Sequence, residues 1–386
     1  MELSRQSIKK TILLFADWYE PGFKAGGPIR SCVHFVHQMK ERYNIYVFTT
    51  DRDLNDSVPY NTVDADKWIE YENGVQVFYC SPAKLSWGHI QHQVKKINPD
   101  FVYLNSMYSR YFTIYPLLMR RLGLINSKIV LAPRGMLKES AVQFKSGKKK
   151  VFLTAFRRMG FHRFIHFHAT DKTEVNDVQR YFGAKARATM ASNFPGMIKD
   201  YPGSIIKKKG ELSVIFIGRL HPVKNLDFLL RTLQLVKGNV LLTIVGNAED
   251  GSYVEQCKEI VKGFPPNIQV KFAGEIPNNQ LGKIITQHHI FALPTQGENF
   301  GHAIFEALAA GKPVLISDQT PWRHLEKAKA GWDIPLQQPE QFTMALQRAV
   351  DLDQFVYDAL SQGAWRFVRE FVQQSELQTA YNNIFS

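Results

Sequence analysis

The stretch from residue 295 to 318, TQGENFGHAIFEALAAGKPVLISD, constrains the fold more than any other part of the chain. A short and mostly apolar run before it, residues 289–293, favours a buried strand. Residues 301–310 are strong helix formers with apolar side chains at helical spacing. Gly311 then ends the helix, because glycine accepts the left-handed backbone conformation, and the apolar run 314–316 is typical of an inner parallel strand. The stretch therefore predicts a strand, loop, helix and strand unit of an α/β fold.

The start of this helix has a chemical consequence. The backbone N–H groups of Phe300, Gly301 and His302 would point out of the helix end, where they carry partial positive charge and favour an anion such as a diphosphate. Glu298 in the loop and Glu306 on the helix add two acceptors for sugar hydroxyls. The plain alternative is a βα unit in which one acid caps the helix and the other is solvated.

The same stretch resembles the E-x7-E segment of retaining GT-B glycosyltransferases, specifically the large family 4. The resemblance implies that Glu298 meets the hydroxyls of the donor sugar, that the backbone of Asn299, Phe300 and Gly301 meets the diphosphate, and that Glu306 holds the ribose. Asn299 stands where the family often has Gly, Pro or Ser, so the sugar stays unassigned. The positions that fit the family pattern are Glu298, Phe300, Gly301, Glu306, Ala307, Ala309, Gly311, Pro313 and Val314.

A second segment of the same half carries a related signal. An apolar strand over residues 213–218 leads into RLHPVKN, which resembles the family segment G-R-L-x-x-x-K-N. The resemblance implies that Arg219 and Lys224 neutralise the departing diphosphate, as phosphate leaving groups require. It also makes Gly246 and Ile276, at the ends of the next two predicted strands, candidates for contact with the nucleobase.

The N-terminal part opens with an apolar strand, residues 11–16, and a loop that contains Gly-Gly-Pro. Such a turn between a first strand and a first helix is where an α/β fold admits phosphate, although it also makes an ordinary turn. The resemblance to the family's N-terminal loop implies that Gly27 approaches the donor phosphates. It further implies that Asp17, Tyr19 and Arg30 face the acceptor.

Three further polar features follow strands of this part. Arg134, in APRGML, stands where many family members carry His; a guanidinium only donates, so we expect Arg134 to hold a phosphate or the acceptor, or to be a surface arginine. The sequence 51–53 mimics a DxD metal motif, but we interpret it as a loop. His166 and His168 share one strand face without an evident third ligand, so we expect core or cleft histidines and no metal site.

The alternation of apolar strands and helical segments predicts two Rossmann-like domains facing across a cleft, as the GT-B resemblance also implies. The sequence of residues 192–209 is rich in Pro, Gly and Lys, which indicates the linker between the two domains. We therefore expect an acceptor-binding domain over 1–191, a donor-binding domain over 210–363, and helices over 364–386 that pack back on the first domain.

Composition adds two limits. Cysteine occurs three times, far apart and without CxxC, and no apolar run reaches membrane-spanning length; both favour a cytosolic protein without structural zinc. The net charge of +13 comes entirely from residues 1–190, which hold 29 Lys and Arg against 16 Asp and Glu, while residues 191–386 hold 19 of each. Residues 138–163 are basic and rich in Phe, as expected for a surface that contacts anionic lipid or a phosphorylated acceptor, binds nucleic acid, or is a solvated helix.

Taken together, the sequence predicts a metal-independent retaining hexosyltransferase that uses no cofactor. Its donor would be a UDP- or GDP-sugar and its acceptor a hydroxyl of a glycan or polyprenyl-diphosphate-linked glycan, in bacterial surface polysaccharide synthesis. The resemblance implies front-face attack, with Glu298 as a binding residue. We expect a cytoplasmic or peripheral membrane protein that binds no nucleic acid. Two alternatives stay open: a sugar-nucleotide epimerase of the same fold, and a non-catalytic protein that binds anionic lipid or nucleic acid.

Overall fold

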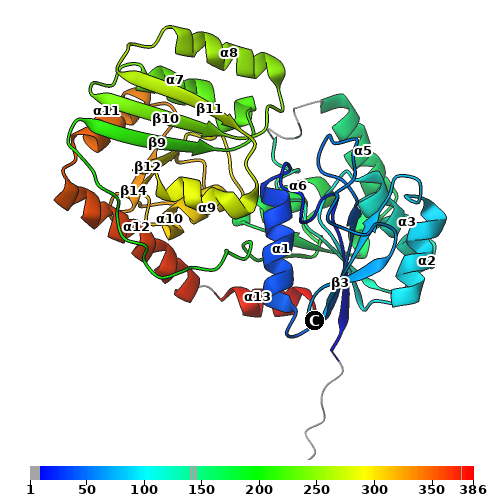
Figure 1. The fold of residues 1–386 in the computed structure, drawn as a ribbon. Coiled ribbons are helices and arrows are strands. Elements are labelled where there is room, and N and C mark those ends of the chain that lie inside the picture. The colour runs from blue at the N-terminus through cyan, green and yellow to red at the C-terminus, as the bar shows by residue number, and fades with distance from the viewer. Residues whose placement is uncertain (1–8, 140–141, 143–145, 375) are drawn as a thin grey trace, which may run out of the picture. The chain divides into compact units, whose positions relative to one another are not determined.

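The structure is a computed structural model that describes residues 9–139, 142, 146–374 and 376–386. The chain divides into two compact units, each built around a mainly parallel sheet (Figure 1). The first unit comprises residues 1–194 and 376–386, and the second comprises residues 195–375. Each unit is an α/β layer structure with its own hydrophobic core, which confirms the predicted fold class.

The first sheet has the strand order β3-β4-β2-β1-β5-β6-β7-β8, and in the described residues only β3 runs antiparallel to its neighbour. Apolar runs on both faces explain why most of these strands are parallel and buried. The strands are β1 Thr11–Phe15, β2 Asn44–Thr50, β3 Trp68–Glu72, β4 Val75–Cys80, β5 Phe101–Leu104, β6 Lys128–Leu131, β7 Ile165–Ala169 and β8 Ala188–Met190.

Helices cover both faces of this sheet (Figure 1). Successive residues of β1 alternate between the two faces: Leu13 and Phe15 join the core beneath α2, α3, α5 and α6, whereas Ile12 and Leu14 join the core beneath α1 and α13. The helices are α1 Gly27–Met39, α2 Trp87–Ile97, a π-helical turn Arg110–Ile114, α3 Tyr115–Arg121, α5 Ser146–Arg158, a 3-10 turn Phe161–Arg163, α6 Lys172–Phe182 and α13 Leu377–Ile384.

The second sheet is parallel throughout the described residues, in the order β11-β10-β9-β12-β13-β14. This is the doubly wound order of nucleotide-binding folds, in which the chain reverses direction between β9 and β12. Its strands are β9 Glu211–Ile217, β10 Asn239–Val245, β11 Ile268–Gly274, β12 Ile290–Leu293, β13 Val314–Ser317 and β14 Gly331–Ile334.

In the second unit, α7 packs with α8 and α11, and α10 packs with α9 and α12. The predicted strand, loop, helix and strand of residues 289–318 are present as β12, α10 and β13. The helices are a 3-10 turn Pro222–Lys224, α7 Leu226–Leu233, α8 Gly251–Lys262, α9 Asn278–Thr286, α10 His302–Ala309, α11 Pro339–Asp351 and α12 Gln354–Gln374.

The C-terminal helices divide differently from the expectation for residues 364–386. Helix α12 belongs to the second unit, where the Ser361 hydroxyl donates to the Gly311 carbonyl at 2.6 Å. Only residues 376–386 belong to the first unit. There Tyr381 stacks on Phe194 with ring centroids 4.1 Å apart, and Phe385 packs on Phe35. The return to the first unit therefore uses α13 alone, and the first boundary lies at residues 194/195.

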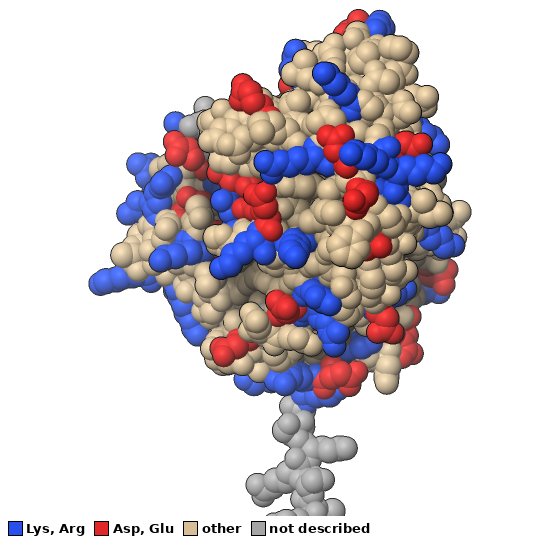
Figure 2. Space-filling view, turned by 90° about the vertical axis from the view of Figure 1, so that its left-hand side faces the viewer, with Lys and Arg blue, Asp and Glu red and all other residues tan. Residues whose placement is uncertain are grey.

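The basic segment 138–163 is partly described. Helix α5 exposes Lys148, Lys150, Arg157 and Arg158, while Phe156 is buried in the core of the first unit. Residues 144 and 145 lie outside the described residues. On the face shown in Figure 2, acidic and basic side chains are interspersed, so the positive excess does not make a single uniform surface there. Of the helices that the structure describes, none is both long and apolar enough to cross a bilayer.

Candidate active site

The candidate site of the second unit lies where the strand order reverses. Strands β9 and β12 are hydrogen-bonded neighbours, yet the chain continues from them toward opposite sides of the sheet. In sheets of this kind, ligands bind outside the carboxyl ends of the strands at that reversal. The loop after β9 contains Arg219 and Lys224, and the loop after β12 contains Glu298.

The two loops are joined by hydrogen bonds through one carbonyl group. The oxygen of Val223 accepts from the Gln296 backbone N–H at 2.8 Å and from the Thr295 hydroxyl at 3.1 Å. The Thr295 side chain is fully buried, so this connection is shielded from competing water. Because Val223 precedes Lys224, the connection fixes that lysine beside the acidic loop.

Lys224 and Glu298 consequently form an ion pair. Their side chains are only 16% and 13% exposed, which makes the mutual attraction stronger than at an open surface. The aliphatic part of Lys224 runs past Gly218, where an added Cβ atom would lie 3.5 Å from Cγ. The structure thus brings together two of the three residues predicted to act on the donor.

Helix α10 starts directly after this loop. Gly301 has φ 78° and ψ 62°, a left-handed conformation that glycine adopts without strain, and no side chain caps the helix start. The Trp322 indole N–H donates to the Phe300 carbonyl oxygen, and the Glu298 backbone N–H donates to the Gln319 carbonyl oxygen at 3.0 Å. The loop after β13 therefore braces the turn that leads into the helix.

The remaining residues predicted in this motif lie on the same turn and helix. Phe300 is buried, and its ring packs against Trp322. Asn299 is half-buried in the loop, and Glu306 is half-buried in the last turns of α10. Contact of these residues with a diphosphate or a ribose stays a prediction.

Arg219 has an acidic partner of its own. Its guanidinium pairs with Glu249, in the loop after β10, at 2.7 Å. The two loops also share backbone hydrogen bonds, including one from the Leu220 N–H to the Asn247 oxygen at 2.8 Å. The Arg219 side chain is 44% exposed, so it can turn toward a ligand after this pair opens.

The two nucleobase candidates have clear structural surroundings. Gly246 follows β10, and a Cβ atom there would lie 1.8 Å from the Gly218 carbonyl oxygen. Glycine is therefore required by the close approach of the two strand ends. Ile276 is half-buried and packs against the core of the second unit. A contact of either residue with a base stays a prediction.

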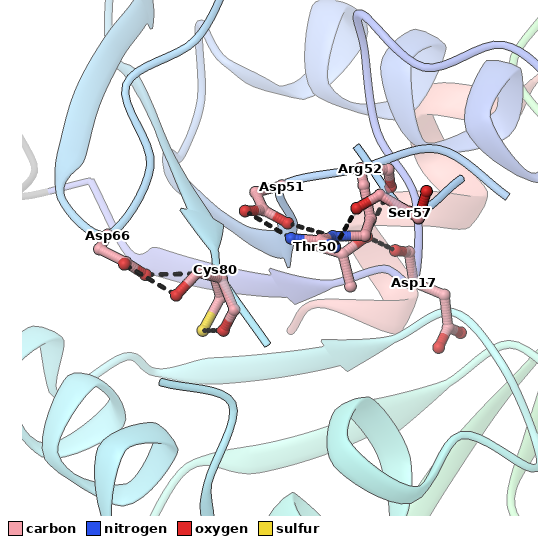
Figure 3. Close-up of polar contacts among 8 residues, drawn as sticks. Asp17, Thr50, Asp51, Arg52, Ser57, Asp66 and Cys80 are labelled. Carbon is pink, nitrogen blue, oxygen red and sulfur yellow. Dashed lines mark hydrogen bonds and ion pairs between the residues drawn. The ribbon is translucent and has the colours of Figure 1, made fainter. Parts of the chain in front are cut away.

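In the first unit, Asp17 lies at the corresponding reversal between β1 and β5. Its Oδ1 accepts the Ser109 hydroxyl at 2.7 Å, and burial raises the pKa of its carboxyl group. Figure 3 shows that its backbone oxygen accepts the Thr50 hydroxyl, at 2.6 Å, while its carboxylate points away from that contact. Asp17 is thus at a ligand-binding edge of the sheet, as its prediction requires.

The DxD-like sequence 51–53 forms a bend after β2, which confirms the loop interpretation. Asp51 pairs with Arg52 at 2.8 Å (Figure 3), and Asp53 accepts the backbone N–H groups of Phe23 and Lys24 at 2.6 and 3.0 Å. The Asp53 carboxylate therefore joins two loops. Among the described residues, no group of three or more His, Cys, Asp or Glu side chains is placed to hold a metal ion.

The other acceptor candidates differ in exposure. Tyr19 is fully buried and packs edge-on against Tyr71, a position that argues against direct contact with an acceptor. Arg30 is half-buried on α1, with Nη1 3.9 Å from the Glu20 carboxylate. Gly27 is exposed as the first residue of α1, so its backbone is accessible.

Arg134 is held by side chains of the first unit. It adopts φ 55° and donates to the Tyr103 hydroxyl at 2.9 Å, to Asn105 Oδ1 at 2.8 Å, and to Asn193. These contacts argue against the surface-arginine interpretation. They also occupy much of the guanidinium, so an acceptor role for Arg134 stays a prediction.

The same network determines which ring nitrogen of His168 carries the hydrogen. Its Nε2 lies 2.8 Å from the Ala191 carbonyl, which can only accept, so Nε2 carries the hydrogen and Nδ1 accepts from the Tyr103 hydroxyl at 2.7 Å. Burial lowers the pKa of His168 to about 3, which keeps the ring neutral. His168 is fully buried and His166 nearly so, as expected for core histidines.

Comparison with known proteins agrees with this geometry. Residues 198–362 match the family described as "Glycosyl transferases group 1". The matched residues lie within the second unit, whose strands and loops form the candidate site. The phosphatidyl-myo-inositol mannosyltransferase of Mycobacterium tuberculosis is 27% identical over 212 residues, which cover 52% of this chain and 54% of that protein. The chain spans about half or less of the length of the curated relatives it matches.

Solved structures confirm the GT-B layout of two parallel-sheet α/β domains. The sucrose-phosphate synthase of Thermosynechococcus elongatus is 16% identical, with a TM-score of 0.71 over 98% of this chain and 99% of that one. The Anabaena protein HepE, solved with UDP and glucose, is 14% identical, with a TM-score of 0.64 over 97% and 98% of the two chains. At such identities the likeness concerns the fold.

Sequence reasoning did not find three residues that shape this site: Glu249, Gln319 and Trp322. Trp322 carried a readable signal, because the polar sequence DQTPW follows directly after the apolar run of β13, where a parallel sheet presents its functional loops. Glu249 carried none, since its pairing with Arg219 depends on the conformation of two exposed loops.

Proposed function

We propose that this protein is a retaining glycosyltransferase that moves a hexosyl group from a nucleoside diphosphate sugar to a hydroxyl group of a glycan or lipid-linked acceptor. The observation that carries this proposal is the ion pair of Lys224 and Glu298, held at the reversal of a doubly wound sheet beside the uncapped start of α10. The family match over residues 198–362 supports it.

In the proposed reaction, the acceptor hydroxyl oxygen forms a bond to the anomeric carbon while the bond from that carbon to the diphosphate oxygen breaks. The departing diphosphate takes the acceptor proton, on the same face as the attack. Lys224, Arg219 after release from Glu249, and the N–H groups at the start of α10 would stabilise the negative charge that develops. Glu298 would bind the sugar hydroxyls and would not act as a nucleophile.

We propose UDP or GDP as the nucleotide and assign no metal or cofactor to the reaction. The Anabaena protein HepE, of similar fold, has been solved with UDP and glucose, which supports a sugar nucleotide as donor. The acceptor would meet the first unit near Asp17, and we propose a polyprenyl-diphosphate-linked glycan of bacterial surface polysaccharide synthesis. The protein would then work in the cytoplasm, at the inner face of the membrane.

The basic segment 138–163 would provide the membrane contact. Helix α5 exposes four cations together with Val151, which is 70% exposed, while its Phe156 is buried. This pattern suits electrostatic attraction to anionic lipid with a small apolar contact. Binding of nucleic acid is not part of the proposal.

A donor screen tests the function directly. Purified protein is incubated with UDP- and GDP-hexoses, with and without a polyprenyl-diphosphate glycan, and with or without EDTA. We expect transfer that needs the acceptor, persists in EDTA and keeps the anomeric configuration, and that Glu298→Ala abolishes. Conversion of the donor sugar without an acceptor would indicate an epimerase, and a covalent sugar adduct on Glu298 would overturn the proposed role of that residue.

A further inference from the structure

The first unit contains a concave feature at the edge of its sheet opposite to Asp17. A cavity of about 270 Å³ lies against the amino ends of β5, β6 and β7. Its apolar wall comes from strand starts and from the C-terminal segment. The lining residues without side-chain charge are Phe101, Ile129, Val130, Phe164, Ile165, Ile384 and Ser386.

The charged side chains that line this cavity are all positive. Arg120 comes from the end of α3, Lys128 from the start of β6, Arg163 from the 3-10 turn before β7, and Arg187 from the residue before β8. No Asp or Glu belongs to the lining, and none of the four cations forms an ion pair with an Asp or Glu that the structure describes. Four separate elements thus each place a cation at the same cavity.

Such convergence has an energetic consequence. Like charges that share a concave surface repel one another and raise the local potential, so a multivalent anion there would relieve the repulsion. Lys128 Nζ donates to the Ser386 oxygen at 2.9 Å, so the positive excess of the cavity comes mainly from the three arginines. Burial and the neighbouring Arg187 lower the pKa of His166, also in the lining, to about 4, so this ring stays neutral near pH 7.

We propose that this cavity binds a phosphate or diphosphate group, separately from the proposed donor site. Three guanidinium groups match the geometry of phosphate oxygens, and the lysine adds a point charge. The phosphate could belong to a small soluble molecule or to a lipid headgroup. Both sources share this chemistry, and the experiment below separates them.

The test compares two matched double variants. Arg163→Gln/Arg187→Gln removes two exposed cations from the cavity. Lys84→Gln/Lys172→Gln removes two exposed cations that follow the carboxyl ends of β4 and β7, at the other edge of the sheet. Both are made in a Lys224→Met/Glu298→Gln background, which weakens the proposed donor site without leaving an unpaired charge. Circular dichroism and the thermal transition without ligand check that each variant folds.

Two probes are used at constant ionic strength. Pyrophosphate is titrated calorimetrically, and vesicles of phosphatidylcholine with or without phosphatidic acid are sedimented with the protein. We expect the cavity variant to bind at least one probe about tenfold more weakly, as for lost charge-assisted hydrogen bonds, and the control to bind it unchanged. Weaker pyrophosphate binding by the cavity variant would identify a soluble phosphate as the ligand. Weaker binding to the vesicles alone would identify a lipid headgroup. No binding of either probe, or equal weakening in both variants, would overturn the proposal.

Discussion

The ammonium group of Lys224 lies against the carboxylate of Glu298, although 74 positions separate the two residues in the chain. Each belongs to a different loop, and the loops meet because β9 and β12 are neighbours in the sheet. The pair is largely shielded from water, so neither charge is well solvated by itself. Stability and donor binding should therefore depend on the two residues jointly.

Replacing both members of this pair should cost less than the two single replacements added together. We expect Lys224→Met or Glu298→Gln alone to lower the free energy of unfolding by about 1–3 kcal/mol, because each leaves a half-buried group without its partner. The double variant should lose less than the sum, with a coupling of about 1 kcal/mol. Urea unfolding of the four proteins measures this coupling, and strictly additive losses would contradict it.

The turn into α10 should not tolerate a side chain at Gly301. A Cβ atom there would lie 2.9 Å from Ile304 Cδ1, and the positive φ adds strain of about 1–2 kcal/mol. We expect Gly301→Ala to lower the thermal midpoint and to weaken UDP or GDP binding about tenfold. Gly297→Ala is the control, because that glycine lies in the same loop with open space around its Cα and without a positive φ. Equal effects of the two substitutions would show that the helix start is not special.

The Arg219 pairing predicts a gain of affinity. If Arg219 binds the diphosphate, opening its exposed pair with Glu249 opposes binding by up to about 1 kcal/mol. Glu249→Gln removes that competitor and one negative charge, so we expect UDP or GDP to bind up to about fivefold more tightly. Isothermal titration at low salt measures the effect. Glu255→Gln, an exposed acid on α8, removes the same charge elsewhere, and an equal gain there would point to net charge alone.

The sequence predicted the parts of this site that local chemistry determines. The strong apolar runs located most strands, and the glycine and helix-former pattern located the start of α10. Strands β3, β8 and β14 were not predicted, because none of them contains a continuous apolar run. Strand β3 has the sequence WIEYE, β8 is the three residues ATM, and β14 has the sequence GWDI. Such short strands exist because their neighbours supply hydrogen bonds.

Features that depend on tertiary packing could not be predicted from the sequence in this way. The sequence predicts helices in this C-terminal region, but tertiary contacts such as that of Ser361 with Gly311 place α12 in the second unit. Tyr19 lies in a sequence typical of a loop, but its side chain is buried against Tyr71. Partner choice by Arg219 likewise depends on the conformation of loops.

The buried histidines of the first unit predict that acid weakens the fold. Burial lowers the pKa of His34 and His166 to about 4 and that of His168 to about 3, below the value of about 6.5 in an unfolded chain. Between pH 6.5 and 4 the unfolded chain therefore binds more protons, and the free energy of unfolding falls as pH falls, by up to about 1.4 kcal/mol per pH unit for each ring. His168→Gln should be less stable at pH 7 but should remove one ring's share of this slope, as urea unfolding at several pH values measures. His92→Gln, which replaces an exposed histidine, should leave the slope unchanged; an unaltered slope in His168→Gln would show that this ring accepts a proton in the folded protein as readily as in the unfolded chain.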